Sequence, residues 1–264
     1  SKVDDNYTVI DKKMGGEYTM HVSFPYDDRM ACSELQLRAE IKCPGGKCKE
    51  FTLVNLNNGE IPTKEEAAVL AAGGAGYIGS HTVVELTKAG FEVVIVDNFS
   101  NSDPSSLDGI RKITGIEPTF VEADCCDKEA MRRVFESYDF DSVIHFAAFK
   151  AVGESVAEPM KYYRNNLLSF VTILELMKEY GRHNVVFSSS ATVYGDAEVL
   201  PVTELTPRKP ATSPYGATKQ MSEDILRDMV FATEGLNGIA LRYFNPIGAH
   251  PSALIGELPR GVPN

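Results

Sequence analysis

The sequence has no apolar run approaching the ~20 residues of a membrane-spanning helix, and its first residues lack the basic-then-apolar pattern of a signal peptide. Basic side chains are also in short supply, since 26 lysines and arginines face 37 aspartates and glutamates, for a formal net charge of −11. These absences argue against a membrane protein and against a nucleic-acid-binding surface, and we expect a cytoplasmic location. The 264 residues, 43% of them hydrophobic, suffice to bury a full α/β domain.

Cysteine is scarce as well, with five residues at positions 32, 43, 48, 125 and 126. An odd number without secretory context favours reduced thiols. Cys43 and Cys48 could instead close a disulfide or supply half of a zinc site. No second pair stands at metal-ligand spacing, so we predict no metal. Cys125 and Cys126 follow a strand signal, where one of the two is expected to face the core.

Three glycines mark the stretch around which the rest of the chain is organised. An apolar run over residues 69–72 leads, through Gly73, Gly76 and Gly79, into an amphipathic stretch over residues 82–88. The order strand, turn, helix is typical of a dinucleotide-binding loop: Gly73 permits the turn, Gly76 lets a pyrophosphate approach the backbone, and Gly79 lets the helix pack on the strand. The start of the helix would offer free amides to the phosphates.

A carboxylate follows the next β-branched run. Residues 91–96 have the length of a strand and end in Asp97, about 20 residues beyond the glycines. A carboxylate there accepts hydrogen bonds from the ribose hydroxyls and repels a 2′-phosphate, so we expect NAD rather than NADP. The alternative is that Asp97 only caps the loop that follows it.

Residues 1–66 differ from the rest of the chain in their pattern of polar and apolar residues. Residues 17–24 alternate in part between polar and apolar side chains, residues 33–43 alternate strictly, residues 44–46 favour a turn, and residues 51–56 favour a returning strand. This pattern predicts a small, half-buried antiparallel β-hairpin of unknown role, joined to a main domain over residues 67–264.

The junction between these parts carries two conflicting signals. Thr63 and the acidic residues after it are typical of a helix start, whereas the glycine motif requires a strand over residues 69–72. We expect the strand, because the neighbouring β-branched strands need a partner.

From residue 67 onward, strand and helix signals alternate. Further strands are predicted over residues 119–121, 184–187 and 238–243, a buried strand and the turn after it within residues 141–149, and helices over residues 107–114, 127–138, 159–180 and 215–233. Repeated β-α units close as a right-handed, mostly parallel sheet with helices on both faces. The predicted fold class is therefore α/β, a doubly wound Rossmann sheet with a small N-terminal β appendage.

Two stretches carry reactive side chains. The strand over residues 184–187 runs into a hydroxyl-rich loop with Ser190 and Thr192, where ligands lie in open α/β sheets. Tyr215 and Lys219 are four residues apart and so share one face of a helix. The lysine charge, added to that of an oxidised nicotinamide, is expected to lower the pKa of Tyr215 toward neutrality, which makes it a base for a sugar hydroxyl. The alternative is a purely structural role for the pair.

The main domain carries many further motifs in one order. They are Gly73-Gly-Ala-Gly-Tyr-Ile-Gly-Ser-His81, Val96-Asp-Asn98, His145-Phe-Ala147, Lys150-Ala-Val-Gly-Glu-Ser155, Tyr162-Tyr-Arg-Asn-Asn166, Ser188-Ser-Ser-Ala-Thr-Val-Tyr-Gly195, Ser213-Pro-Tyr-Gly216 and Leu241-Arg-Tyr-Phe-Asn-Pro-Ile-Gly-Ala-His-Pro251. With these motifs at this spacing, residues 67–264 resemble the UDP-glucose 4-epimerase family of extended short-chain dehydrogenases/reductases.

The resemblance implies that Ser190 and Tyr215 form the acid/base pair, with Lys219 as the catalytic contact to the nicotinamide ribose. It implies cofactor contacts from the glycine loop and the strand ends: Gly73, Gly76, Tyr77, Ile78, Gly79, Asp97, Asn98, Asp124, Cys125, Phe146, Lys150, Asn165 and Tyr243. It implies substrate contacts from Lys150, Ser190, Thr192, Tyr215, Phe244 and Asn245. The implied reaction moves a hydride from C4 of a UDP-hexose to NAD and back to the other face of the 4-keto sugar, which interconverts UDP-glucose and UDP-galactose.

Some residues differ from the motifs of the epimerase family or of related sugar-nucleotide dehydratases. Sugar-nucleotide dehydratases place an Asp-Glu pair after the active-site threonine, whereas Val193 and Tyr194 follow Thr192 here, so elimination is disfavoured. Ala72 and residues 148–149 differ mildly from the family pattern. Family members continue well beyond position 264 into a segment that builds most of the nucleotide-sugar lobe, so we expect most of that lobe to be absent from this chain.

Three functions stay open on these residues. The chain is an epimerase, in the form of a fragment, a fusion or a natural short form; a non-catalytic NAD-binding scaffold or chimeric subunit; or another sugar-nucleotide oxidoreductase or epimerase of the same fold. Family members are commonly homodimers through helices that here cover residues 159–180 and 215–233, which implies a homodimer.

Overall fold

The structure of the chain is a computed structural model that describes residues 3–11, 16–24, 36–42, 48–55 and 68–257, the first four ranges as backbone only. The chain divides into two compact units, Ser1–Ile61 and Pro62–Asn264.

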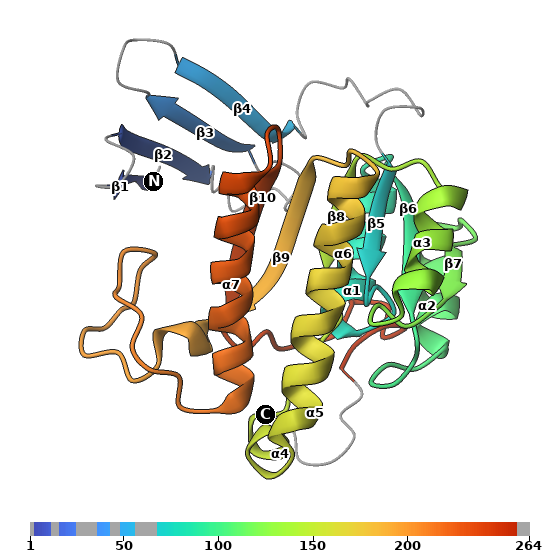
Figure 1. Cartoon of the computed structure of the whole chain (residues 1–264). Helices are drawn as coiled ribbons and strands as arrows, with labels where there is room; N and C mark the ends of the chain where they lie inside the picture. The colour runs from blue at the N-terminus through green and yellow to red at the C-terminus, as the bar shows by residue number, and fades with distance from the viewer. Residues whose placement is uncertain (1–2, 12–15, 25–35, 43–47, 56–67, 258–264) are drawn as a thin grey trace. The chain divides into compact units, whose positions relative to one another are not determined.

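The first unit contains an antiparallel sheet of four strands in sequence order (Figure 1). The strands are β1 (Val3–Asp11), β2 (Gly16–Phe24), β3 (Gln36–Lys42) and β4 (Cys48–Asn55). The predicted hairpin corresponds to β3 and β4, which pair with Ala39 opposite Phe51. Two further strands, β1 and β2, extend it. The predicted turn over residues 44–46 and the side-chain faces of the hairpin lie outside what the structure describes.

The second unit is built on a six-stranded sheet in which every neighbouring pair is parallel. The strands run in the order β10-β9-β8-β5-β6-β7. Their bounds are β5 (Ala68–Ala72), β6 (Glu92–Asp97), β7 (Thr119–Glu122), β8 (Ser142–His145), β9 (Asn184–Ser190) and β10 (Asn237–Tyr243). The direction of winding reverses between β5 and β8, which confirms the doubly wound prediction and marks the point where such sheets bind ligands.

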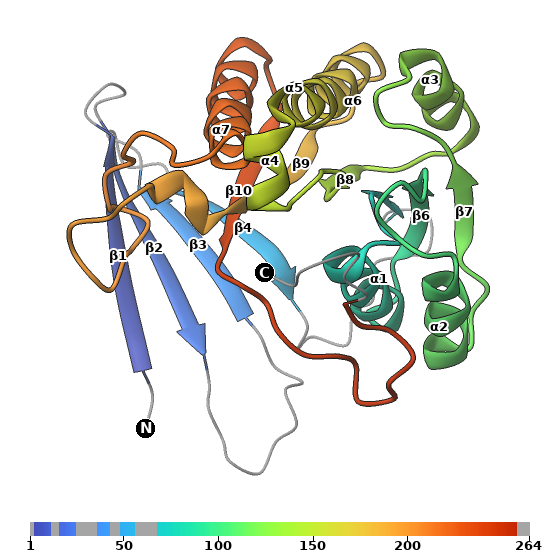
Figure 2. The ribbon, with the colours of Figure 1, turned by 90° about the horizontal axis from the view of Figure 1, so that it is seen from below.

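Helices cover both faces of this sheet. In Figure 2, α1 and α2 lie on one face, and α3, α6 and α7 lie on the other. The helices are α1 (Tyr77–Lys88), α2 (Ser105–Thr114), α3 (Lys128–Ser137), α4 (Val152–Ala157), α5 (Pro159–Tyr162), α6 (Leu168–Glu179) and α7 (Pro214–Ala232), with a π-helical turn Tyr163–Leu167 and a 3-10 turn Ala191–Tyr194. The long helix predicted over residues 159–180 is thus α5 and α6, joined by the π-helical turn, and α4 was not predicted.

The conflict at the junction is resolved in favour of the strand. Residues 69–72 are buried and pair on one side with β6 and on the other with β8. Leu70 and Ala72 pack into the cluster under α3 and α6, whereas Ala71 packs into the cluster under α1 and α2. Pairing and burial on both faces therefore outweigh the local helix signal, as predicted.

The helix α3 shows how local sequence fixes an element. The Asp127 carboxylate accepts hydrogen bonds from the amides of Glu129 and Ala130, each at 3.0 Å. These two amides have no partner within the helix, so the side chain satisfies them and fixes the start of α3.

The segment after β10, which is one edge strand of the sheet, runs back to the helices near the other edge. In Figure 2 it runs, in dark red, from β10 past the carboxyl edge to α1 and α2. Ile255 joins the buried cluster that contains Ile95 and Ile110. A Cβ on Gly109 of α2 would lie 2.6 Å from the Ile255 side chain, so the segment packs directly on the helix. Among the described helices, none is both long and apolar enough to cross a membrane.

Candidate active site

The predicted nucleotide loop joins β5 to α1 at the switch point. Gly73 has a φ of +80°, and its amide donates to the Val96 carbonyl at 2.7 Å. A Cβ on Gly73 would lie 2.6 Å from the Ala147 amide nitrogen, and one on Gly79 would clash with the Gly73 carbonyl and lie 2.8 Å from Gly74 Cα. Glycine is therefore required at both positions, by backbone conformation and crowding at the first and by crowding at the second.

Gly76 differs from these two glycines. A Cβ there would meet one atom within 4 Å, the Gly73 carbonyl oxygen at 3.3 Å. Gly76 caps α1, whose first residues include the partly buried Tyr77 and Ile78. The absence of a side chain thus keeps the amides at the start of α1 open to an anion.

Asp97 lies at the carboxyl end of β6 and is 8% exposed. One carboxylate oxygen accepts from the Ala75 amide at 3.1 Å, and the other accepts from the Phe99 amide at 2.9 Å and the Ser102 hydroxyl at 2.7 Å. Asp97 therefore caps the loop after β6 and also ties it to the glycine loop. A carboxylate has about four acceptor positions, so three bonds leave room for a further donor.

Polar side chains further along this edge form local turns. The Asn98 side chain accepts from the Ser100 amide at 3.0 Å, and Asp124 accepts from the Cys126 amide at 2.8 Å. Cys125 is buried in the core, and burial raises the pKa of its thiol, which confirms that one of the two cysteines faces inward.

Two adjacent asparagines lie in the π-helical turn. Asn166 is buried; its side chain accepts from the Phe149 amide at 2.9 Å and donates to the Phe149 carbonyl at 3.0 Å and to the Thr218 hydroxyl at 3.2 Å. The Asn165 amide group donates to Asn166 at 3.0 Å. Asn166 therefore fixes the loop after β8 against α7, a role that was not predicted from the motif Tyr162-Tyr-Arg-Asn-Asn166.

The loop after β8 begins close to the glycine turn and leads to Lys150. The amide of Phe146 donates to the Ala72 carbonyl at 2.7 Å. Lys150 forms an ion pair with Glu257, and its ammonium lies 5.8 Å from the centre of the Tyr77 ring. The Tyr77 hydroxyl donates to the Gly248 carbonyl at 2.7 Å. Both predicted cofactor contacts, Lys150 and Tyr77, are thus bonded to the segment after β10.

Tyr215 and Lys219 lie near the start of α7, where the Ser213 hydroxyl accepts from the Gly216 amide at 3.1 Å. Lys219 is 4% exposed, and its ammonium donates to the Ser188 carbonyl at 2.6 Å. The ammonium lies 5.8 Å from the centre of the Tyr215 ring. Burial lowers the pKa of Lys219 to about 7, against a smaller opposing effect of the Glu223 charge.

Ser190 ends β9 beside this pair. Its hydroxyl oxygen accepts from the Thr192 amide at 3.2 Å and from the Thr192 hydroxyl at 3.0 Å. Burial raises the pKa of Tyr215, and a hydrogen bond with Ser190 offsets part of that rise. The lowering of the Tyr215 pKa that the sequence predicts includes the charge of an oxidised nicotinamide, and it stays a prediction. Burial acts on both members of the pair, since it raises the pKa of Tyr215 and lowers that of Lys219.

The end of β10 also lies at the carboxyl edge of the sheet. Tyr243 pairs in register with Ser190, and burial raises the pKa of its hydroxyl, with a hydrogen bond to Ser188 acting in the opposite direction. Phe244 is 62% exposed, and Asn245 is exposed as well. These two side chains are accessible to a ligand at the carboxyl edge.

His145, at the end of β8, is 1% exposed, and neither ring nitrogen has a hydrogen-bond partner among the described residues. Its ring packs against Phe170 and Phe187, with centroids 5.0 and 6.0 Å away. Burial, with a smaller effect of the Lys219 charge, lowers the pKa of His145 to about 3, so the imidazole is neutral. No cluster of three metal-ligating side chains occurs in the part of the chain that the structure describes.

The chain is similar in sequence and in structure to known proteins. A family model described as "NAD dependent epimerase/dehydratase family" matches residues 69–261. The UDP-glucose 4-epimerase of Bacillus subtilis is 55% identical over 197 residues, which cover 75% of this chain and 58% of that protein. The human UDP-glucose 4-epimerase is 50% identical over 202 residues, which cover 74% of this chain and 58% of that protein.

Solved structures give the same result. The UDP-glucose 4-epimerase from Bifidobacterium longum, in complex with NAD+ and UDP, superposes with a TM-score of 0.73 and 48% identity, over 75% of this chain and 59% of that one. The chain thus spans about 58% of the length of the curated relatives it matches.

Proposed function

Because the chain belongs to the NAD dependent epimerase/dehydratase family, we propose that its carboxyl-edge site catalyses the interconversion of UDP-glucose and UDP-galactose, with NAD as cofactor. The observation that carries the proposal is the grouping of Ser190, Tyr215 and Lys219 at the end of β9, beside the point where the sheet reverses its winding.

The residues at the switch point fit NAD. A loop with glycine at positions 73, 74 and 76 leads into the start of α1, which suits a pyrophosphate, and Asp97 keeps an acceptor position for a ribose hydroxyl. NAD, when bound, supplies a hydride acceptor that also returns the hydride. We assign the remaining cofactor contacts to the residues along the same edge: Tyr77, Ile78, Asn98, Asp124, the backbone of Cys125, Phe146, Lys150, Asn165, Lys219 and Tyr243.

Tyr215 is the proposed acid and base. Its phenolate takes the proton of the sugar 4-hydroxyl and later returns it. The Ser190 hydroxyl shares this proton through a hydrogen bond. The charge of Lys219 stabilises the phenolate, which burial alone disfavours.

Substrate contacts are proposed around this pair. Thr192 bonds to Ser190, and Phe244 and Asn245 are exposed at the end of β10. Lys150 is assigned to both ligands and would exchange its ion pair with Glu257 for contacts to them.

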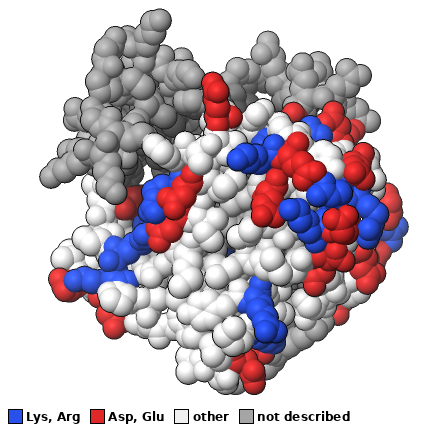
Figure 3. Space-filling model, in the orientation of Figure 1, with Lys and Arg blue, Asp and Glu red and all other residues white. Residues whose placement is uncertain are grey.

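A homodimer through α6 and α7 is also part of the proposal. In Figure 3 an uncharged area lies between groups of charged side chains on the face that carries these two helices, which face the viewer in Figure 1. Apolar side chains on the helical segments nearby are exposed, among them Met160 at 60% and Met221 at 44%. Light scattering should give twice the chain mass, and Met160→Glu with Met221→Glu should give a monomer. A monomeric wild-type chain would refute this part.

The reaction is tested on protein purified without added nucleotide. Denaturation should release NAD into the supernatant, and the native protein should convert UDP-galactose to UDP-glucose. Tyr215→Phe should retain NAD but lose turnover at least about 100-fold, the usual contribution of a general base. Tyr138→Phe, at the end of α3, is the matched control and should keep both. NAD without turnover would restrict the function of this chain to nucleotide binding, and a chain that binds no NAD would refute the proposal.

A further inference from the structure

A third polar residue continues the row formed by Tyr215 and Lys219. Glu223 follows at the same spacing of four residues, so all three lie on one face of α7. The Glu223 side chain is 9% exposed. A buried carboxylate is costly unless it is paired, and this one lies one helical turn from a buried lysine.

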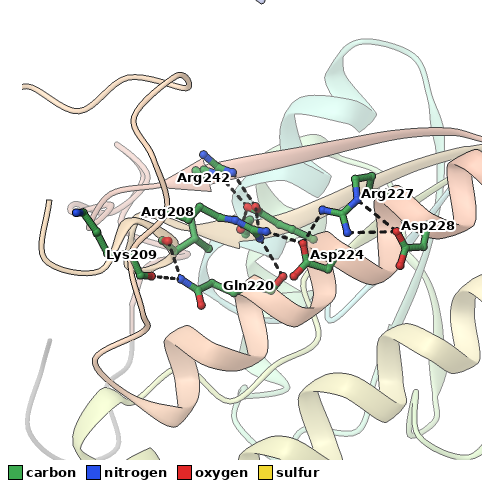
Figure 4. A network of polar contacts seen from close by, with 10 residues as sticks. Arg208, Lys209, Gln220, Asp224, Arg227, Asp228 and Arg242 are labelled. Atoms are coloured by element: carbon green, nitrogen blue, oxygen red, sulfur yellow. Dashed lines mark hydrogen bonds and ion pairs between the residues drawn. The ribbon is translucent and has the colours of Figure 1, made fainter. Parts of the chain in front are cut away.

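Neighbouring elements hold the Glu223 carboxylate in place. The Ser189 hydroxyl of β9 donates to it at 2.6 Å. Arg242 of β10 donates to both carboxylate oxygens, at 2.9 and 2.7 Å, and Arg208 approaches to 3.6 Å. Figure 4 shows Arg208 and Arg242 reaching toward the same part of α7. Fork-like pairing with a guanidinium fixes the position of the carboxylate.

The groups around Lys219 differ in charge. From β8 it faces His145, which is neutral, and from β9 the Ser188 carbonyl and the Phe187 ring. On α7 itself it has Tyr215, whose phenol is uncharged because burial raises its pKa, and Glu223. Among the described residues, Glu223 is the one whose charge opposes the effect of burial on Lys219.

We propose that Glu223 is a positioning residue of the site, whose anchored carboxylate keeps Lys219 protonated beside Tyr215. Its importance for turnover rests on the function proposed above, in which the lysine charge stabilises the phenolate. Arg242 and Ser189 act through Glu223, since they set where its charge lies.

Glu223→Gln removes the negative charge and leaves both arginines in place, whose positive charges then act against the ammonium. The pKa of Lys219, about 7 in the native chain, should fall by about one pH unit. Arg242→Met should have the opposite effect, because it removes a compensating positive charge and leaves the carboxylate. Asp228→Asn, on the same helix but with a side chain 73% exposed, is the matched control and should change nothing.

The measurement is an NMR titration of protein labelled with ¹³Cε-lysine, without NAD or sugar. The Lys219 signal is assigned by its loss in Lys219→Arg. A Lys219 pKa that falls in Glu223→Gln and rises in Arg242→Met supports the proposal; a pKa that moves in neither variant overturns it. If Glu223→Gln does not fold, Arg242→Met decides alone, and an unchanged pKa there refutes the idea.

The titration is independent of turnover. A Lys219 pKa that responds as expected in a chain without epimerase activity would leave Glu223 in its role and count against the proposed reaction. An active chain whose Lys219 pKa ignores both variants would overturn only the inference on Glu223.

Discussion

Replacing Gly79 by alanine should destabilise the second unit, although alanine is the better helix former. Gly79 lies in the first turn of α1, and a Cβ there would clash with the Gly73 carbonyl and lie 2.8 Å from Gly74 Cα. Both neighbours are backbone atoms of a turn that also packs on the loop after β8, so neither can move aside cheaply. Gly153 in α4 is the matched position, because a Cβ there meets nothing within 4 Å.

The two substitutions should therefore differ in sign. Overpacking costs about 1–3 kcal/mol, and contacts with rigid backbone on this scale place Gly79→Ala at the upper end. A gain of up to about 1 kcal/mol in helix propensity offsets part of it, which leaves a net loss of about 2 kcal/mol. For a unit of this size that lowers the Tm by about 4–8 °C. Gly153→Ala should gain about 0.5–1 kcal/mol and raise the Tm by about 1–4 °C.

The sequence contains no tryptophan, so unfolding is best followed by circular dichroism at 222 nm. All helices in the described residues lie in the second unit, so this signal reports mainly on that unit. NAD retention, measured on the same samples, should fall in Gly79→Ala and stay unchanged in Gly153→Ala. If Gly79→Ala proves as stable as Gly153→Ala, the crowding argument for the third glycine is wrong.

Two further substitutions test the buried histidine and the helix cap. The folded pKa of His145 is about 3, against 6.5 for a free histidine, so the unfolded state binds the extra proton and stability falls as the pH drops below 6.5. Urea unfolding should show that the native chain loses about 2 kcal/mol relative to His145→Phe between pH 7 and pH 5, and parallel pH profiles would contradict this. Asp127→Ala should lower the Tm by about 2–4 °C, because α3 loses a cap worth about 1 kcal/mol, whereas Asp127→Asn should keep most of it. Equal losses in the two Asp127 variants would show that the carboxylate does not act as the cap.

Local patterns were sufficient for the sheet and for the glycine loop. The β-branched run that ends in Asp97 and the three glycines encode a strand, a turn and a helix within about 30 residues, and the structure places them as predicted. The strand over residues 69–72 was predicted against its own helix propensity, because the pairing needs of its neighbours could be read from their sequences.

Long-range partners could not be read in this way. The ion pair of Lys150 with Glu257 and the pairing of Glu223 with Arg242 join residues that no periodic pattern connects. The rise that burial gives to the Tyr215 pKa could not be read from the sequence, since burial depends on how α7 packs. The π-helical turn was not predicted, because it lies inside one continuous helical signal in the sequence.

The return of residues 248–257 to α1 and α2 has a consequence for synthesis on the ribosome. Ile110 leaves the ribosome roughly 150 residues before Ile255, the side chain that covers it, and at about 5–20 residues per second this interval lasts about 7–30 s. The strands β7 to β10 are made during this interval, and when they are complete the α1 and α2 face still lacks its last apolar side chain. Chaperones that bind exposed apolar surface should therefore protect this half of the nascent chain until Ile255 emerges.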